Sequence, residues 1–307
     1  MTADRRRMLQ VLAAFAAIYV VWGSTYLAIR YAVETLPPFL MAATRFLIAG
    51  AALFGWARLR GAPAPSRAQW RVAALIGALY FLGGNGLLSW AEQRVPSGEA
   101  SLLVATMPLW LALFEATTGS APIPGPRILG GIVLGLAGVA VLVGAPVPGT
   151  GRGVDLLGAG ALVLASALWA IGSLPAVRRG GPGSPILGAG MQMLGGGALL
   201  VLLGTVTGEF TRFDAGAVAL RSVLSLAYLV AFGSLVGFTS FAWLLHSVPP
   251  GRVATYAFVN PVVAVLIGWA VGGESLGPRV LLASALVVAA VALIVTADRG
   301  EVAREAP

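Results

Sequence analysis

The chain has 307 residues, of which 58% are hydrophobic and only 10% are charged. A soluble domain averages about a quarter charged residues, so this composition excludes an ordinary soluble protein. The sequence contains no cysteine and a single histidine, which excludes disulfides, thiolate chemistry and histidine-based metal clusters. We therefore expect neither a metal nor a cofactor.

The net charge of +8 comes entirely from arginine, since the chain has 20 basic residues and none of them is lysine. A basic surface is typical of nucleic-acid-binding proteins. Here, however, the arginines stand at the ends of long apolar stretches, as they do in the loops of membrane proteins. The charge therefore predicts a lipid bilayer as the partner of this chain, and no nucleic acid.

Glycine, proline and charged clusters divide the apolar sequence into ten stretches that are long enough to cross a membrane. The first five are expected at about 11–33, 39–58, 71–90, 98–118 and 127–144. A Gly/Pro-rich linker at 145–154 precedes five more, at about 155–177, 184–207, 216–245, 252–272 and 278–297. Residues 1–10 and 298–307 are expected to be cytoplasmic tails. The sequence therefore predicts an all-α membrane protein with ten transmembrane helices.

The second half of the chain repeats the first. Residues 95–98 read Val-Pro-Ser-Gly and residues 248–251 read Val-Pro-Pro-Gly, while Pro108 matches Pro261 at the same offset. Because each repeat holds an odd number of spans, the second must enter the membrane from the opposite side. We therefore expect two inverted five-helix repeats, 11–144 and 155–297, around a central cavity, as in secondary transporters.

The arginines also predict an orientation. With the N-terminus inside, thirteen arginines fall in inner segments and seven in outer segments or outer span ends. Loops rich in arginine stay on the cytoplasmic side. The count therefore favours a multi-pass protein of the cytoplasmic (inner) membrane with both termini in the cytoplasm.

A pair of proline-interrupted spans at matching places in the two repeats indicates where a transporter binds its substrate. Here these are span four, with Met107-Pro108, and span nine, with Asn260-Pro261. A proline within a helix lacks an N–H and clashes with the carbonyl four residues earlier, which kinks the helix and frees a backbone oxygen for a ligand. We expect Pro108 and Pro261 to shape gating helices; a kink that only shapes the bundle is the alternative.

Polar and aromatic residues near the middle of other spans complete the predicted site. Tryptophan usually lies at the membrane interface, so a mid-span tryptophan beside hydroxyl groups suits the wall of a cavity for an amphipathic solute. Simple helix packing is the alternative. The predicted substrate-binding residues are Trp22, Ser24, Tyr26, Asn85, Trp169, Tyr256 and Asn260.

Ionisable residues give a weaker signal. Arg30, Glu34 and Arg45 lie near outer span ends, where extension of the side chain toward water or mutual pairing explains them. The sequence places no acid near the middle of a span, which disfavours a carboxylate proton relay but leaves one open through Glu34, Glu92 or Glu115. Proton coupling is therefore kept as a possibility, and the oligomeric state is left open.

Several of these motifs together resemble the EamA domain of the drug/metabolite transporter superfamily. They are Trp22-Gly23-Ser24-Thr25-Tyr26, Pro37-Pro38 with Arg45, Val95-Pro96-Ser97-Gly98, Ala254-Thr255-Tyr256 through Asn260-Pro261, and Gly273-Glu274. The resemblance covers nearly the whole chain as two tandem repeats. It implies a ten-helix protein of the cytoplasmic membrane with a central cavity, most similar to bacterial exporters of amino acids and related metabolites. The first repeat departs from the family's Gly-Glu pair, because Ser120-Ala121 stands there.

The expected function is therefore secondary transport, not enzymatic catalysis. We expect export of amino acids or related small amphipathic metabolites by alternating access. Export of lipophilic or cationic drugs is an alternative that predicts an acid in the cavity. A lipid-modifying membrane enzyme would need paired acids or histidines at one site, and a non-transporting scaffold would leave the matched prolines unexplained.

Overall fold

The computed structural model describes residues 3–117, 125–144, 155–174, 177, 179–248, 253 and 255–302. These residues form helices and connecting turns, and no strand occurs among them. The predicted linker 145–154, the Ser120-Ala121 pair and the second Val-Pro-Pro-Gly motif beyond Val248 lie outside the described residues.

Five spans make up the first half. In chain order the helices are α1 (Ala3–Ala16), η1 (Ala17–Val21), α2 (Trp22–Ala32), α3 (Pro38–Leu59), α4 (Arg67–Gly77), η2 (Ala78–Gly86), α5 (Leu87–Ala91), α6 (Ser97–Val104), α7 (Met107–Thr117) and α8 (Pro126–Gly144). The first span is α1 to α2, the third is α4 to α5, and both pass through a wider π-helical stretch (η1, η2). The fourth span is divided into α6 and α7.

The second half has the same number of spans. Its helices are α9 (Leu156–Ser173), α11 (Pro185–Val206), α12 (Glu209–Arg212), η3 (Ala215–Ala217), α13 (Leu220–Tyr228), η4 (Leu229–Val236), α14 (Gly237–Ser247), α16 (Tyr256–Ala270) and α17 (Pro278–Val302). Across the described residues, eight helical segments are long and apolar enough to cross a membrane, and Val259–Ala270 and Pro278–Ile294 are shorter apolar helices. The ten predicted spans are confirmed as helices, most of them within a few residues. The exceptions are at the two ends, where residues 3–10 and 298–302, expected as tails, belong to α1 and α17.

Local sequence signals set the ends of several spans. Ser66 accepts a hydrogen bond from the Gln69 backbone while the Gln69 side chain bonds back to Ser66, which forms a capping box at the start of α4. Asp155 caps α9 through the Gly158 N–H at 2.6 Å. Proline begins α3 at Pro38, where its missing N–H costs nothing. These signals explain where the three helices begin; the Ser66 cap starts α4 at Arg67, four residues before the predicted start at 71.

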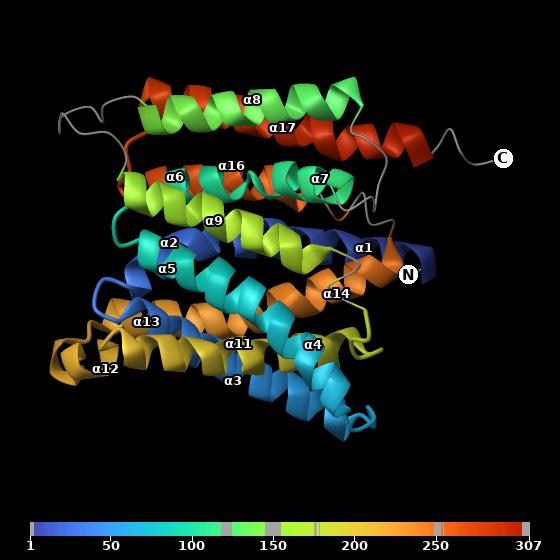
Figure 1. Cartoon of the computed structure of the whole chain (residues 1–307), viewed down its shortest axis with the longest axis vertical. Coiled ribbons are helices and arrows are strands. Elements are labelled where there is room, and N and C mark those ends of the chain that lie inside the picture. The colour runs from blue at the N-terminus through green and yellow to red at the C-terminus, as the bar shows by residue number, and fades with distance from the viewer. Residues whose placement is uncertain are drawn as a thin grey trace.

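The helices pack in a pattern that is unchanged when the two halves are exchanged (Figure 1). The second span of each half packs on the other, as α3 on α11, and the fifth spans do the same, as α8 on α17. The first span of each half then contacts the third and fourth of the other half. Thus α2 packs on α13 and α16, while α9 packs on α5 and on both parts of the fourth span.

The start of α1 and the end of α17 lie at the same end of the bundle (Figure 1). With five spans in each half, the second half therefore runs through the bundle in the opposite direction to the first. The chain is accordingly an all-α membrane protein whose two five-helix repeats are inverted relative to each other.

Glycines let the paired helices approach closely. A Cβ on Gly190 of α11 would lie 2.7 Å from the backbone nitrogen of Phe54 in α3, and a Cβ on Gly131 of α8 would lie 2.6 Å from the Ile294 side chain in α17. Small residues at such crossings allow backbone-to-backbone packing in a membrane, where helices gain little from hiding apolar surface. The surface of the bundle is correspondingly apolar, as at Val133 and Val206.

Candidate functional site: the cavity between the repeats

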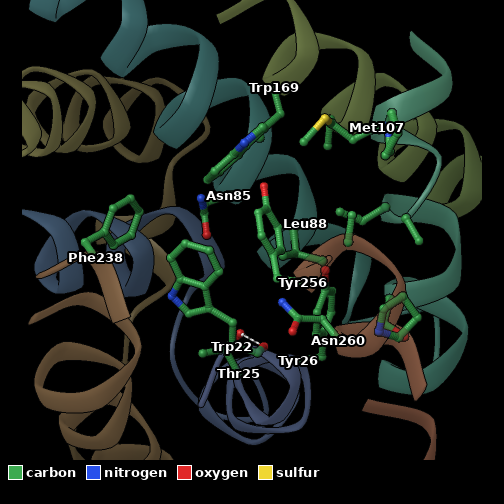
Figure 2. A pocket seen from close by; sticks show the side chains of 18 of the residues that line it. Trp22, Thr25, Tyr26, Asn85, Leu88, Met107, Trp169, Phe238, Tyr256 and Asn260 are labelled. Carbon is green, nitrogen blue, oxygen red and sulfur yellow. Dashed lines mark hydrogen bonds between the residues drawn. The ribbon is translucent and has the colours of Figure 1, made fainter. Parts of the chain in front are cut away.

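A cavity of about 130 Å³ lies where the two repeats meet. Residues from seven of the ten spans line it, and α3 contributes Arg45. Figure 2 shows the rings of Trp22, Trp169 and Tyr256 and the amides of Asn85 and Asn260 gathered around this space. Of the residues predicted from the sequence, the cavity is lined by Trp22, Tyr26, Asn85, Trp169, Tyr256 and Asn260, and by both Pro108 and Pro261.

The Trp22 ring is held on three sides. Its Nε1 donates a hydrogen bond to the carbonyl of Gly233 at 3.1 Å. Its ring forms edge-type (T-shaped) contacts with two other rings. The centroid distance is 5.3 Å to Tyr256 and 5.5 Å to Phe238. The approach to η4 and α14 depends on Gly237, where an added Cβ would lie 2.2 Å from the indole nitrogen. The position of Trp22 is therefore set by helices of the opposite repeat.

Trp169 is fixed by stacking. Its ring lies parallel to that of Tyr80, with centroids 4.4 Å apart and planes 17° apart. The Tyr80 hydroxyl lies 3.0 Å from the Ser173 hydroxyl, one turn after Trp169. This arrangement again joins one span of each repeat, α9 and η2.

Asn85 lies on the wide π-helical stretch η2. Its Nδ2 donates to the Tyr80 carbonyl at 3.2 Å, five residues earlier. The corresponding span of the second repeat carries η4, so both third spans are widened at matching places. Such π-helical turns occur frequently at functional sites, because they expose backbone groups and re-aim side chains.

The two predicted prolines, Pro108 and Pro261, differ in their effect on the helix that contains them. Before Pro108 the fourth span breaks at Ala105 and Thr106, and the oxygen of Val104, left without its helical donor, accepts a hydrogen bond from the Ser166 hydroxyl at 3.1 Å. The expectation that this oxygen is free for a ligand was wrong, because α9 supplies a donor. Pro261 instead lies within the continuous helix α16.

Ser24 lies outside the cavity, contrary to expectation. Its hydroxyl donates to the Val21 carbonyl at 2.8 Å and lies 2.6 Å from the Tyr228 hydroxyl, in a separate groove between α2 and α13. Trp22, Thr25 and Tyr26 line the cavity instead, since residues three and four apart share a helix face and residues two apart do not.

Two buried polar groups stand out in the cavity lining. Arg45 is 4% exposed, its Nε donates to the Ser234 hydroxyl at 2.9 Å, and it forms no ion pair with any described residue. Asn260 is 7% exposed, and its Oδ1 has no hydrogen-bond partner within the described part of the chain. Buried polar groups are normally satisfied, so an unsatisfied one in a cavity is a place for a ligand atom.

Arg45 was missed by the sequence reading. Its place near a span end suggested a side chain that reaches water or pairs with an acid, and both interpretations were wrong for this residue. Arg30 and Glu34 do form ion pairs, but not with each other: the Arg30 guanidinium lies 3.0 Å from Glu274, and Glu34 pairs with Arg221. In the sequence, Arg45 closely follows the Pro37-Pro38 turn. This was the only signal for Arg45, and it does not show whether the side chain is buried.

Glu274 links the repeats at the end of the bundle away from the two chain ends. It accepts hydrogen bonds from the Ser97 N–H and hydroxyl, each at 2.8 Å, and from the Gly98 N–H at 2.9 Å. The carboxylate therefore caps α6 of the first repeat. Nearby, Arg279 donates to Glu99 at 2.7 Å. Within the described residues no three acids or histidines come together in a way that would hold a metal ion.

The sequence matches the model of the EamA-like transporter family over residues 8–144 and again over residues 156–296. The chain belongs to this family. A 38% identical relative, the inner membrane transporter YedA of Escherichia coli K12, aligns over 292 residues, which are 94% of this chain and 92% of YedA. The transporter YvbV of Bacillus subtilis is 26% identical over 93% of this chain and 92% of its own length.

A solved crystal structure has the same fold as this EamA chain, with a TM-score of 0.64 and 23% identity over 94% of this chain and 98% of the other. A plant relative, the chloroplastic WAT1-related protein At3g02690 of Arabidopsis thaliana, is 26% identical over 89% of this chain and 66% of its own length. The EamA family and these bacterial relatives are transporters, so this chain is a transporter of the EamA type and not an enzyme.

Proposed function

We propose that this EamA protein exports amino acids, or closely related small amphipathic metabolites, across the cytoplasmic membrane by alternating access. The observation that supports this most strongly is the pair of buried polar groups in the cavity. Arg45 offers a guanidinium without an ion-pair partner among the described residues, and Asn260 offers an amide oxygen without a donor there. An α-amino acid brings a carboxylate for the first and an ammonium group for the second.

The aromatic wall suits the same solute. The faces of Trp22, Trp169 and Tyr256 provide apolar contact for a side chain, and an aromatic face also attracts an ammonium group. A buried cavity of about 150 Å³ accommodates a molecule such as benzene. The present cavity of about 130 Å³ therefore favours a single small solute.

The cavity argues against the export of cationic drugs, which remains the alternative. Such a substrate calls for an acid in the lining, whereas the charged residue among the described lining residues is Arg45. A drug-sized ligand also needs a pocket of several hundred Å³. Export through this cavity would require it to widen considerably.

The proposed orientation in the membrane follows from the distribution of the arginines. Thirteen of the 20 arginines fall on the side of the N-terminus, so we propose that both termini are cytoplasmic. The inner membrane location is supported by the similarity to YedA, an inner membrane transporter. Proton coupling is part of the proposal.

Flux through purified protein tests the function. Proteoliposomes preloaded with unlabelled leucine, alanine or threonine should take up the same labelled amino acid by exchange, with saturable kinetics. Asn260→Leu removes the unpaired amide oxygen from the cavity and should lower the exchange rate at least about tenfold, equivalent to about 1.4 kcal/mol. Gln10→Leu, which changes an exposed amide on α1, is the matched control and should keep the full rate. Absence of saturable exchange for all three amino acids would overturn the proposal.

A further inference from the structure

We propose that Glu92 is a proton-binding site linked to the cavity through Arg45, so that a proton on Glu92 and a solute carboxylate at Arg45 stabilise each other. This inference rests on the proposed function for the identity of the solute. The link between Glu92 and Arg45 does not rest on the proposed function, because it concerns only two residues of the protein and no solute.

Glu92 is the one acid among the described residues whose carboxyl is buried with both oxygens unbonded. It is 3% exposed, and neither Oε1 nor Oε2 has a hydrogen-bond partner there. The other buried acids are satisfied: Glu99 accepts from Arg279 at 2.7 Å, and Glu209 accepts from the Leu40 N–H at 2.9 Å. An ionised carboxylate without partners is costly to bury, so Glu92 is the acid most suited to hold a proton.

Glu92 lies one helical turn beyond the cavity. It follows α5 directly, in the connection to α6, and Leu88 four residues earlier lines the cavity. Residues four apart share a helix face, so the carboxyl continues the cavity-facing side of α5. The charge of Glu92 also acts on Tyr26 and Arg45, and both of these residues line the cavity.

The charged and titratable groups around Glu92 come from several elements. Arg30 and Tyr26 lie on α2, Arg45 lies on α3, and Glu274 lies between α16 and α17. Arg30 is already paired with Glu274 at 3.0 Å. From the start of α9, Asp155 pairs with Arg94 at 3.8 Å, so neither of these two residues supplies a free charge.

Burial raises the pKa of the Glu92 carboxyl well above its ordinary value of 4.5, and the negative charge of Glu274 raises it further. The positive charges of Arg30 and Arg45 act in the opposite direction. The protonation of Glu92 therefore depends on what neutralises Arg45.

A solute carboxylate bound at Arg45 would neutralise the guanidinium charge. It offsets the guanidinium charge and repels an ionised Glu92, and both effects favour the protonated carboxyl. The linkage is reciprocal, so a proton on Glu92 tightens carboxylate binding by the same factor. The proton binds a Glu92 oxygen from the aqueous solution and returns to solution on the other side. Proton and solute thus move in the same direction, and export would run on the gradient of the solute.

Infrared spectroscopy tests the linkage directly. In the purified protein, a protonated carboxyl gives a C=O stretching band. The part of this band that is absent from Glu92→Gln belongs to Glu92 and reports its protonation. Its titration midpoint should rise by about one pH unit, a tenfold gain in proton affinity, when Arg45→Gln removes the guanidinium charge. Arg45→Lys should keep the midpoint of the unchanged protein, and it also controls for folding. An unshifted midpoint in a folded Arg45→Gln protein would overturn the proposal.

A second arm adds the solute. Leucine should raise the midpoint in the unchanged protein, whereas leucinamide, which lacks the carboxylate, should not. Glu34→Gln, which removes a carboxylate at the same end of the bundle that is paired with Arg221, should respond like the unchanged protein. If leucine has no effect but Arg45→Gln still shifts the midpoint, the proton site stands and the proposed amino-acid substrate is wrong. If leucine is transported but neither change shifts the midpoint, the proposed function stands and the proton site is wrong.

Discussion

The carboxylate of Glu274, in the second repeat, caps the helix that begins at Ser97 in the first. Its Oε1 accepts from both the N–H and the hydroxyl of Ser97 at 2.8 Å. The same carboxylate also pairs with Arg30, so a single side chain ties together the first, fourth and ninth spans. The Gly-Glu pair noticed in the sequence therefore has a structural role, joining the two repeats at one end of the bundle.

Replacing this carboxylate should destabilise the protein. Glu274→Ala leaves the Ser97 and Gly98 N–H groups without their acceptor, and hydrogen bonds to charged groups contribute about 1.5 to 3 kcal/mol each. We expect the free energy of unfolding to fall by about 2 to 4 kcal/mol. Thermal unfolding in detergent measures this. Glu34→Ala removes a more exposed ion pair and should cost at most about 1 kcal/mol. Equal effects of the two changes would contradict this account of Glu274.

Gly237 should be essential to the cavity, although it does not line it. A Cβ there would lie 2.2 Å from the Trp22 indole nitrogen, so Gly237→Ala must displace the ring or separate α2 from α14. We expect a loss of at least about tenfold in the exchange rate. Gly160→Ala is the control, because a Cβ on Gly160 meets no atom within 4 Å. That change should keep the rate and stabilise α9 slightly, since alanine favours helix more than glycine. Normal transport by Gly237→Ala would show that the Trp22 position is unimportant.

Ser166 should stabilise the interruption of the fourth span between α6 and α7. Ser166→Ala removes the donor to the Val104 oxygen and leaves a part-buried carbonyl without it, which costs at most about 1 to 3 kcal/mol. Ser284→Ala is a suitable comparison, because among the described residues the Ser284 hydroxyl bonds only within its own helix, to Val280 at 2.6 Å. Chemical or thermal unfolding of the two variants should separate them by at least about 1 kcal/mol. Similar stabilities would mean that the Val104 oxygen finds another donor.

The stability of the protein should depend on pH through Glu92. Because its pKa is raised in the folded state, the stability it contributes is present below the ordinary value of 4.5 and is lost as the pH rises through the higher folded value. The unfolding temperature of the unchanged protein should therefore fall relative to that of Glu92→Gln as the pH rises above 4.5. Parallel curves for the two proteins over this range would contradict a raised pKa.

The sequence predicted the fold well, because each span is long, apolar and bounded by strong local signals such as Pro38, Ser66 and Asp155. The inverted repeat followed from motif spacing and from the odd number of spans. Both are properties of single segments or of their order. They do not depend on how the segments later pack.

Residues that line the cavity could be predicted where a residue type is unusual within a span, but not where packing decides which face of the helix turns inward. Trp22, Trp169 and Asn260 stand out among apolar neighbours and do line the cavity. Ser24 lies only two positions from Trp22, but the rotation of α2 is fixed by its contacts with α13 and α16, which the sequence does not reveal. Arg45 was missed because burial near a span end depends on helices of the opposite repeat.

The most direct test of the central claim is the accessibility of the cavity from the two sides of the membrane. The chain has no cysteine, so Ala257→Cys introduces a single thiol into the cavity lining. Val133→Cys, on the outer surface of α8, is the control that should not react with a polar reagent. A membrane-impermeant maleimide should label Ala257→Cys from either side, and leucine should slow the labelling. Labelling from one side only, unchanged by any transported solute, would contradict alternating access between the repeats.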